Sequence, residues 1–232
     1  GDHRDLHSFP TRRSSDLRAG RRPPPAFDAM PVEARVEPGG AVTLISPVDP
    51  FYNIRVQRRV HLHPLLPVMT ITTTYERVSG APIQVGVSVL TQLNDPDGVY
   101  ALLPDKKRGA GYALLSKDHP AEIKYKKGLL SLERDKKTGR KIGCEAGSLL
   151  WVGRACSLRI DSPRVPEAVY PDQGSSAEIY TSPDPLKYVE LGMLGPLRTL
   201  KAGERIEQTS TYTLIRRSES KPEAEARKIF GL

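Results

Sequence analysis

Hydrophobic and polar residues alternate along several stretches of the chain, with the period of two that is typical of a half-buried β-strand. The pattern is strong in residues 54–62, where Arg58 interrupts it. It returns in residues 68–78 and again in residues 83–93. The tetrapeptide SGAP at residues 79–82 lies between these two stretches and has the composition of a turn. The sequence therefore predicts that residues 68–78 and 83–93 pair as a long antiparallel hairpin.

Shorter apolar stretches predict further strands over the rest of the chain. Residues 100–120 and 164–176 have the composition of loops. Strands do not alternate with helices along the sequence, so nothing in it indicates a parallel sheet. Many short strands joined by polar turns are typical of all-β proteins, so we predict a large antiparallel β-sandwich. The further strands are expected at residues 41–45, 123–125, 129–132, 149–152, 157–160, 177–181, 188–191 and 206–215.

The two ends of the chain depart from this pattern. Residues 18–40 are rich in proline and arginine and are expected to be extended rather than helical. Residues 41–216 form the predicted β-domain. Residues 217–232 predict a short helix, because Ser220 and Glu223 have the spacing of a capping box.

The first 17 residues are interpreted as an artefact rather than as native sequence. The string GDHRDLHSFPTRRSSDL resembles one reading frame of a common short-read sequencing adapter. Such a segment is excluded from reasoning about fold and function. It also implies that the native N-terminus is missing. We therefore expect a fragment that lacks the first strands of its sandwich and exposes one sheet edge.

The chain is basic, with a formal net charge of +8. Its positive charge lies in short runs at predicted loops, without the interleaved aromatic residues of a single-strand nucleic-acid site, so we expect no nucleic-acid partner. No apolar run reaches about 18 residues, the length that spans a bilayer. The two cysteines, Cys144 and Cys156, leave open whether a disulfide forms.

Three segments of the chain resemble the galactose mutarotase-like superfamily. They are residues 44–64 (LISPVDPFYNIRVQRRVHLHP), residues 70–93 (TITTTYERVSGAPIQVGVSVLTQL) and residues 171–214, which begin PDQGSSAEIYTSP. The chain is most similar to an uncharacterised branch known only as a domain of unknown function. The resemblance implies an antiparallel β-supersandwich. Because the superfamily includes aldose epimerases, sugar-binding accessory domains and domains of glycosidases and polysaccharide lyases, its fold does not settle function.

The resemblance also implies a catalytic residue. Epimerases of this fold open a hexose ring with a glutamate as base and a histidine as acid. The segment YVELGMLGPLRTLKAGE matches the late strand that carries the glutamate, which places it at Glu190. The alternative is a structural carboxylate paired with an arginine such as Arg198. The histidine would fall near Gln92, which can hydrogen-bond a sugar but cannot act as a general acid, and this argues against standard mutarotation.

The histidines outside the adapter-like segment predict no metal site. His61 and His63 are two residues apart and would share a strand face with Arg55 and Arg59, whose charges repel a metal ion. We expect neither a metal nor another cofactor.

A sugar site is predicted on a face shared by two late strands. Glu178 and Tyr180 are two residues apart, as are Tyr188 and Glu190, so each pair shares one face of its strand. If these strands pair, two carboxylates and two tyrosines converge, which suits a sugar and raises one carboxyl pKa. The alternative is a solvated sheet face. Gln92 is expected to join the site, with a rim formed by Tyr170, Asp172 and Gln173.

The preferred interpretation is a carbohydrate-binding domain without standard mutarotase activity. Two alternatives stay open: an aldose 1-epimerase-like isomerase that uses Glu190, and an envelope structural or interaction protein without a sugar ligand. The resemblance indicates a bacterial protein that is periplasmic or secreted. The sequence leaves open which sugar binds and which oligomeric state forms.

Overall fold

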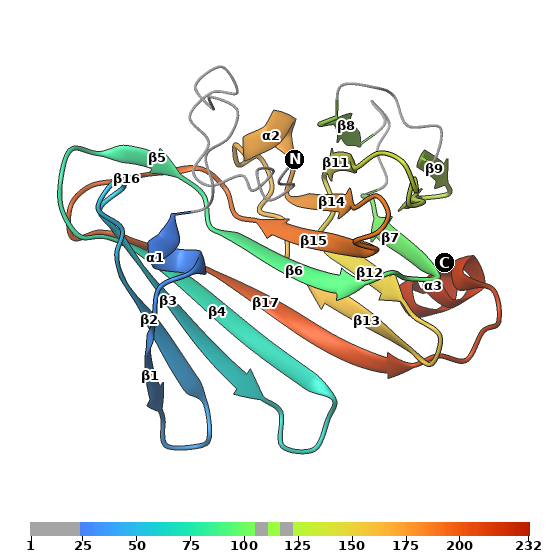
Figure 1. Ribbon diagram of the computed structural model, residues 1–232, viewed down its shortest axis with the longest axis horizontal. Coiled ribbons are helices and arrows are strands. Elements are labelled where there is room, and N and C mark those ends of the chain that lie inside the picture. The colour runs from blue at the N-terminus through green and yellow to red at the C-terminus, as the bar shows by residue number, and fades with distance from the viewer. Residues whose placement is uncertain (1–23, 105–110, 117–122) are drawn as a thin grey trace. The chain divides into compact units, whose positions relative to one another are not determined.

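The computed structural model describes residues 24–104, 111–116 and 123–232, which form antiparallel β-sheets with short helices (Figure 1). The adapter-like residues 1–17 lie outside these ranges. The described residues divide into two compact units, the first within residues 24–88 and 195–210 and the second within residues 89–194 and 211–232. The predicted all-β antiparallel class is confirmed. Within the described ranges, no helix combines the length and the apolar character needed to cross a membrane.

The first unit is built on consecutive antiparallel strands. β1 (Glu33–Val36), β2 (Val42–Val48), β3 (Ile54–Leu62) and β4 (Val68–Arg77) pair in chain order, and β17 (Arg205–Arg216) follows β4 in the sheet. β3 has the bounds predicted from its alternation. Its apolar positions at the start are buried, whereas the intervening polar positions are half-buried or exposed.

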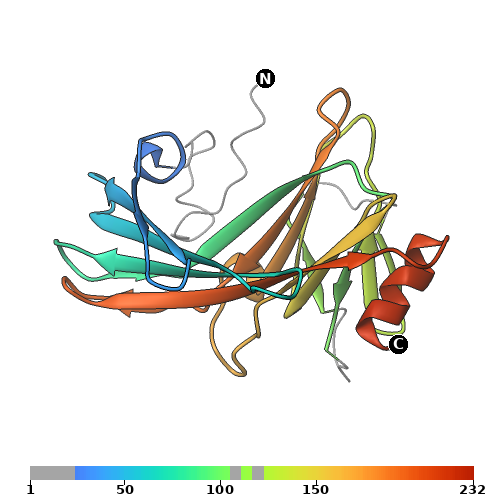
Figure 2. The same cartoon turned by 90° about the horizontal axis from the view of Figure 1, so that it is seen from below.

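A single helical turn covers part of one face of this sheet. α1 (Pro25–Asp28) lies on one side of the strands (Figure 2), and the ring of Phe27 stacks on that of Tyr75 with centroids 6.4 Å apart. Residues 18–40 were predicted to be extended, but α1 forms because proline at its first position is compatible with a helical turn.

The predicted hairpin of residues 68–78 and 83–93 is wrong. The second stretch divides into β5 (Ile83–Val85) and β6 (Ser88–Asn94). β5 pairs with β16 (Arg198–Leu200), and β6 pairs with β15 (Tyr188–Leu194). The division falls at Gly86, where a Cβ would lie 2.6 Å from the carbonyl oxygen of Gly195. Only glycine allows two backbones to approach so closely, and alternation along a strand does not reveal this crossing.

The second unit contains a five-stranded sheet in the order β6-β15-β14-β11-β8. β8 spans Tyr112–Leu114, β11 spans Arg140–Cys144 and β14 spans Ala177–Thr181. The inward residues of β14 and β15, among them Ile179 and Leu191, are fully buried in the core of the unit. Cys144 is buried on β11, and both cysteines are free thiols.

Further strands of the second unit lie in the order β13-β12-β7-β10-β9, beside residues 211–216 of β17. Their bounds are Cys156–Asp161, Ser148–Val152, Gly98–Leu102, Leu129–Leu132 and Ile123–Lys126. β7 was predicted as part of a loop. It pairs with β12 on one side and β10 on the other, and its three middle residues are all buried. A strand buried on both faces shows no alternation, so its pattern is missed.

The predicted C-terminal helix is present as α3 (Pro222–Phe230), but its capping box is not. Lys221 occupies the N-cap position and makes no side-chain cap hydrogen bond. Instead the buried carboxylate of Glu225 accepts the backbone N–H groups of Ser218 and Glu219 at 3.1 and 2.8 Å. One face of α3 packs on a cluster from β7, β10 and β12, where Ala226 is fully buried.

Candidate functional site

The sheet face predicted to bind a ligand lies on β14 and β15. These strands pair antiparallel, with Tyr180 opposite Glu190 and Glu178 opposite Gly192. Paired residues share a face, and alternate residues along each strand return to it. Glu178, Tyr180, Tyr188 and Glu190 therefore lie on one side of the sheet, and Ile179 and Leu191 lie on the other.

Lys141 on β11 extends this polar face. It lies opposite Tyr180 in the pairing of β11 with β14, and its Nζ is 2.8 Å from Oε2 of Glu178. The two side chains are 11% and 2% exposed. Sequence reasoning missed Lys141 because β11 is short and contains a glycine, so its alternation is weak.

Burial controls the protonation of Glu178. Loss of contact with water raises the pKa of this carboxyl from the ordinary 4.5 to about 7. The charge of Lys141 acts in the opposite direction, and the nearby Asp172 carboxyl raises the pKa further. Near neutral pH, Glu178 therefore exchanges between a neutral acid that donates a hydrogen bond and a carboxylate that accepts one.

Tyr180 on β14 lies beside Tyr188 and Glu190, which are both on β15. The rings of Tyr180 and Tyr188 are tilted, with centroids 6.0 Å apart. Burial, followed by the effects of Tyr188 and Glu190, raises the pKa of Tyr180 to about 12, so its hydroxyl remains a donor at neutral pH. Gly139 makes room for this hydroxyl, because a Cβ there would lie 2.8 Å from the phenolic oxygen.

Asp172 and Gln173 lie in a tight turn, α2 (Pro171–Gly174), whose inner residues have left-handed backbone angles. Their φ values are 47° and 63°, and that of Gly174 is 88°. The Ser175 N–H closes the turn on the carbonyl of Pro171 at 2.9 Å. The turn brings the Asp172 carboxyl near Glu178 and leaves Gln173 exposed. Non-glycine residues held in this region cost energy and occur preferentially at functional sites.

Tyr170 supports the loop that leads into α2. It is 6% exposed, and the guanidinium carbon of Arg164 lies 4.3 Å from its ring centroid. Its hydroxyl accepts the Val165 N–H at 2.8 Å. The structure thus places Tyr170 within the protein, whereas the sequence predicted a residue at the rim of the site.

Gln92 lies on β6, the outer strand of the five-stranded sheet, and is exposed. Leu90 on β6 lies on the same face as Glu178. A Cβ built on Gly192, which is between them, would lie 2.9 Å from Leu90 Cδ2 and 3.4 Å from Glu178 Cβ. Because alternate residues share a face, Gln92 points to the same side as Glu178. Solvent therefore reaches this face at β6, whereas Glu190 is only 7% exposed.

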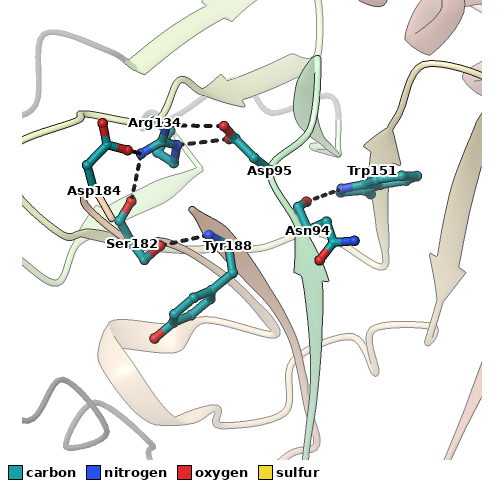
Figure 3. Close-up of polar contacts among 7 residues, drawn as sticks. All are labelled: Asn94, Asp95, Arg134, Trp151, Ser182, Asp184 and Tyr188. Carbon is teal, nitrogen blue, oxygen red and sulfur yellow. Dashed lines mark hydrogen bonds and ion pairs between the residues drawn. The ribbon is translucent and has the colours of Figure 1, made fainter. Parts of the chain in front are cut away.

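A nearly buried arginine fixes one end of the candidate site (Figure 3). The guanidinium of Arg134 donates to Asp95 Oδ1 at 2.8 Å and to Asp184 Oδ1 at 2.8 Å. It also donates to the carbonyl of Ser182 at 3.4 Å, and Ser182 Oγ accepts the Tyr188 N–H at 2.8 Å. These contacts join the end of β6 to the connection between β14 and β15. They hold the backbone of Tyr188 at the edge of the polar face.

Comparison with known proteins gives a match only at the level of three-dimensional structure. No protein-family model matches the chain, and no curated protein sequence matches it.

Three solved structures illustrate the similarity. A protein provisionally assigned as an aldose 1-epimerase from Escherichia coli K12 superposes with a TM-score of 0.58 at 12% identity, over 80% of this chain and 69% of that chain. A TPR-domain containing protein from Parabacteroides distasonis gives 0.56 at 13% identity, over 82% and 36%. A galactose mutarotase-like protein from Lactobacillus casei gives 0.53 at 11% identity, over 79% and 72%.

The strand pairing and these superpositions define the chain as an antiparallel β-sandwich protein. More particularly, it has the galactose mutarotase-like fold, as the resemblance of its sequence implied. At identities of 8–13% the similarity extends to the fold alone.

Proposed function

We propose that the chain is a carbohydrate-binding domain of the galactose mutarotase-like type, without standard mutarotase activity. The sugar would bind on the polar face of β6, β15, β14 and β11. One observation carries this proposal: the register that places Tyr180 opposite Glu190 also puts Glu178 on that face. Carboxylates and tyrosines together suit a ligand with many hydroxyl groups and apolar C–H surfaces.

The burial of these polar groups supports a binding role. Glu178 is 1% exposed, Tyr180 is 3% exposed and Glu190 is 7% exposed. Burial raises the pKa of the Glu178 carboxyl, and perturbed carboxyls concentrate at functional sites. In this proposal Glu190 accepts hydrogen bonds from sugar hydroxyls and Tyr180 donates one. Gln92, the exposed member, contacts the sugar at the edge.

An epimerase role has one supporting observation. Glu178 has a pKa of about 7 and lies on the face of Glu190, so it can exchange a proton near neutral pH in place of the missing histidine. Its side chain is only 2% exposed and contacts Lys141, which favours a supporting role. Polarimetry with freshly dissolved α-anomers of aldohexoses separates the two functions. We expect no acceleration over buffer, and an acceleration that Glu190→Gln abolishes would establish the isomerase.

The binding proposal is tested with a glycan array, followed by calorimetry on the sugars that the chain retains. Glu190→Gln is expected to weaken binding about tenfold or more, because a charged hydrogen-bond acceptor is lost. Glu207→Gln, an exposed strand residue of β17, is the matched control and should bind as the unmodified chain does. Retention of no sugar, or equal binding by Glu190→Gln, would contradict the proposed site.

A further inference from the structure

The turn between β3 and β4 presents an exposed apolar tip. Its sequence, LHPLLP, occupies residues 62–67. Leu62 is 67% exposed, Leu65 is 88% exposed and Leu66 is 55% exposed. Single exposed leucines are common on protein surfaces, but three within five residues of one turn form a patch. We call residues 62–67 the leucine tip.

The backbone donors from His63 to Val68 are satisfied without water. The N–H groups of Leu65 and Leu66 both donate to Nδ1 of His63, at 3.1 and 3.0 Å. The His63 N–H donates to the carbonyl of Val68 at 2.8 Å, and the Val68 N–H to the carbonyl of Leu66 at 2.7 Å. The other two residues of this stretch, at positions 64 and 67, are prolines and have no N–H.

This pattern distinguishes the leucine tip from an ordinary polar turn. Backbone N–H groups at a surface usually bond to water, and burying them in an apolar medium is costly when they lack a partner. Here the side chain of His63 takes the place of that water. The side chains of Leu65 and Leu66 can therefore enter an apolar medium without leaving a backbone donor from His63 to Val68 unsatisfied.

The support of the leucine tip is rigid and carries positive charge. β3 and β4 are joined by a ladder of nine residue pairs that ends at Leu62 opposite Met69. Arg58 and Arg59 lie on β3 within four residues of Leu62. Arg59 Nε is 2.7 Å from Oε2 of Glu37 near the neighbouring β1–β2 turn, so part of this positive charge is balanced within the sheet. Both turns lie at the same end of the strands (Figure 1).

We infer that the leucine tip inserts into the interface of a lipid bilayer that carries anionic headgroups. The leucines enter the boundary between headgroups and acyl chains, and the arginines of β3 remain at the level of the phosphates. A protruding tip whose backbone N–H groups are already hydrogen-bonded suits a lipid interface, because lipids can rearrange around the inserted side chains. This surface belongs to the first unit, and the inference does not depend on the proposed sugar site in the second.

Vesicle sedimentation tests the inference with the full chain. The vesicles are phosphatidylcholine alone and phosphatidylcholine with roughly 30% phosphatidylglycerol. We expect the chain to sediment with the mixed vesicles, and several-fold more weakly with phosphatidylcholine alone. The double variant Leu65→Ser/Leu66→Ser should lower the partition coefficient at least about tenfold, because two leucines no longer enter the apolar boundary. Circular dichroism checks that this variant keeps the β-sheet spectrum.

Phe51→Ser is the matched control. Phe51 is an apolar residue that is 58% exposed and lies in the turn between β2 and β3. This variant should partition as the unmodified chain does. Failure of the chain to sediment with either kind of vesicle would overturn the inference and leave a protein partner as the occupant of the tip. Equal losses in Phe51→Ser and in the double variant would overturn it as well, because apolar adhesion would then be unspecific.

Discussion

Glu178→Gln is expected to remove a pH dependence from the stability of the second unit. Glu178 is 1% exposed, and burial raises the pKa of its carboxyl from 4.5 to about 7. Because the pKa is higher in the folded state, the folded chain binds this proton more tightly than the unfolded chain does. The stabilisation by that proton is fully present below about pH 4.5 and is lost as the pH rises through about 7.

The size of the effect follows from the two pKa values. A rise from 4.5 to about 7 corresponds to about 3 kcal/mol of unfolding free energy, at about 1.4 kcal/mol for each pH unit. Glutamine has no proton to lose and leaves Lys141 beside a neutral side chain, as protonated Glu178 does at low pH. The variant should therefore match the unmodified chain near pH 4.5 and be the more stable protein above about pH 7.

Urea unfolding at several pH values between about 4.5 and 8 measures this difference, with the fluorescence of Trp151, the single tryptophan, as the signal. Glu133→Gln is the control, because Glu133 is 61% exposed and pairs with Lys124 at the surface. The difference in unfolding free energy between Glu133→Gln and the unmodified chain should change little with pH. If the Glu178→Gln difference is also flat, or has the opposite slope, the ion pair with Lys141 outweighs burial and the argument is wrong.

Two further changes test the supports of the candidate site by the same unfolding measurement. Arg134→Met is expected to lower the unfolding free energy by about 2 kcal/mol, since Asp95 and Asp184 lose a shared partner but are each about 40% exposed to water. A loss below about 0.5 kcal/mol would mean that the arginine contributes no more than a surface ion pair. Gln173→Gly is expected to raise the unfolding free energy by up to about 1 kcal/mol, because φ at this position is 63°. A substantial loss would show instead that the Gln173 side chain stabilises the turn.

Elements of the fold were predictable where one face of a strand is buried and the other is not. β3, whose burial alternates at its start, has the bounds that the sequence predicted. β14 also has its predicted bounds although all of its residues are buried, because polar side chains alternate with apolar ones along it. Strand partners were not predictable in the same way. Residues 83–93 were assigned to a hairpin with β4, but the close approach of Gly86 to Gly195 sends the chain elsewhere, and no local pattern records that contact.

In the candidate site too, the features that depend on local alternation were predictable and those that depend on distant contacts were not. The shared face of Glu178, Tyr180 and Glu190 follows from a period of two and from the pairing of two strands that are neighbours in sequence. Lys141 and Arg134 come from distant segments, so their arrival depends on tertiary packing. The sequence also did not indicate that Glu178 is almost completely buried.

The long strand β17 contributes residues to both compact units. Its residues 205–210 belong to the first unit and its residues 211–216 to the second. During synthesis β1 to β4 leave the ribosome before β17 does. One edge of β4 therefore has no partner strand while residues 89–194 are made. At about 5–20 residues per second this interval lasts roughly 5–20 s, long enough for an open strand edge to meet other chains. A nascent chain of this protein therefore needs its β4 edge shielded, by a chaperone or by its own segments, until β17 emerges.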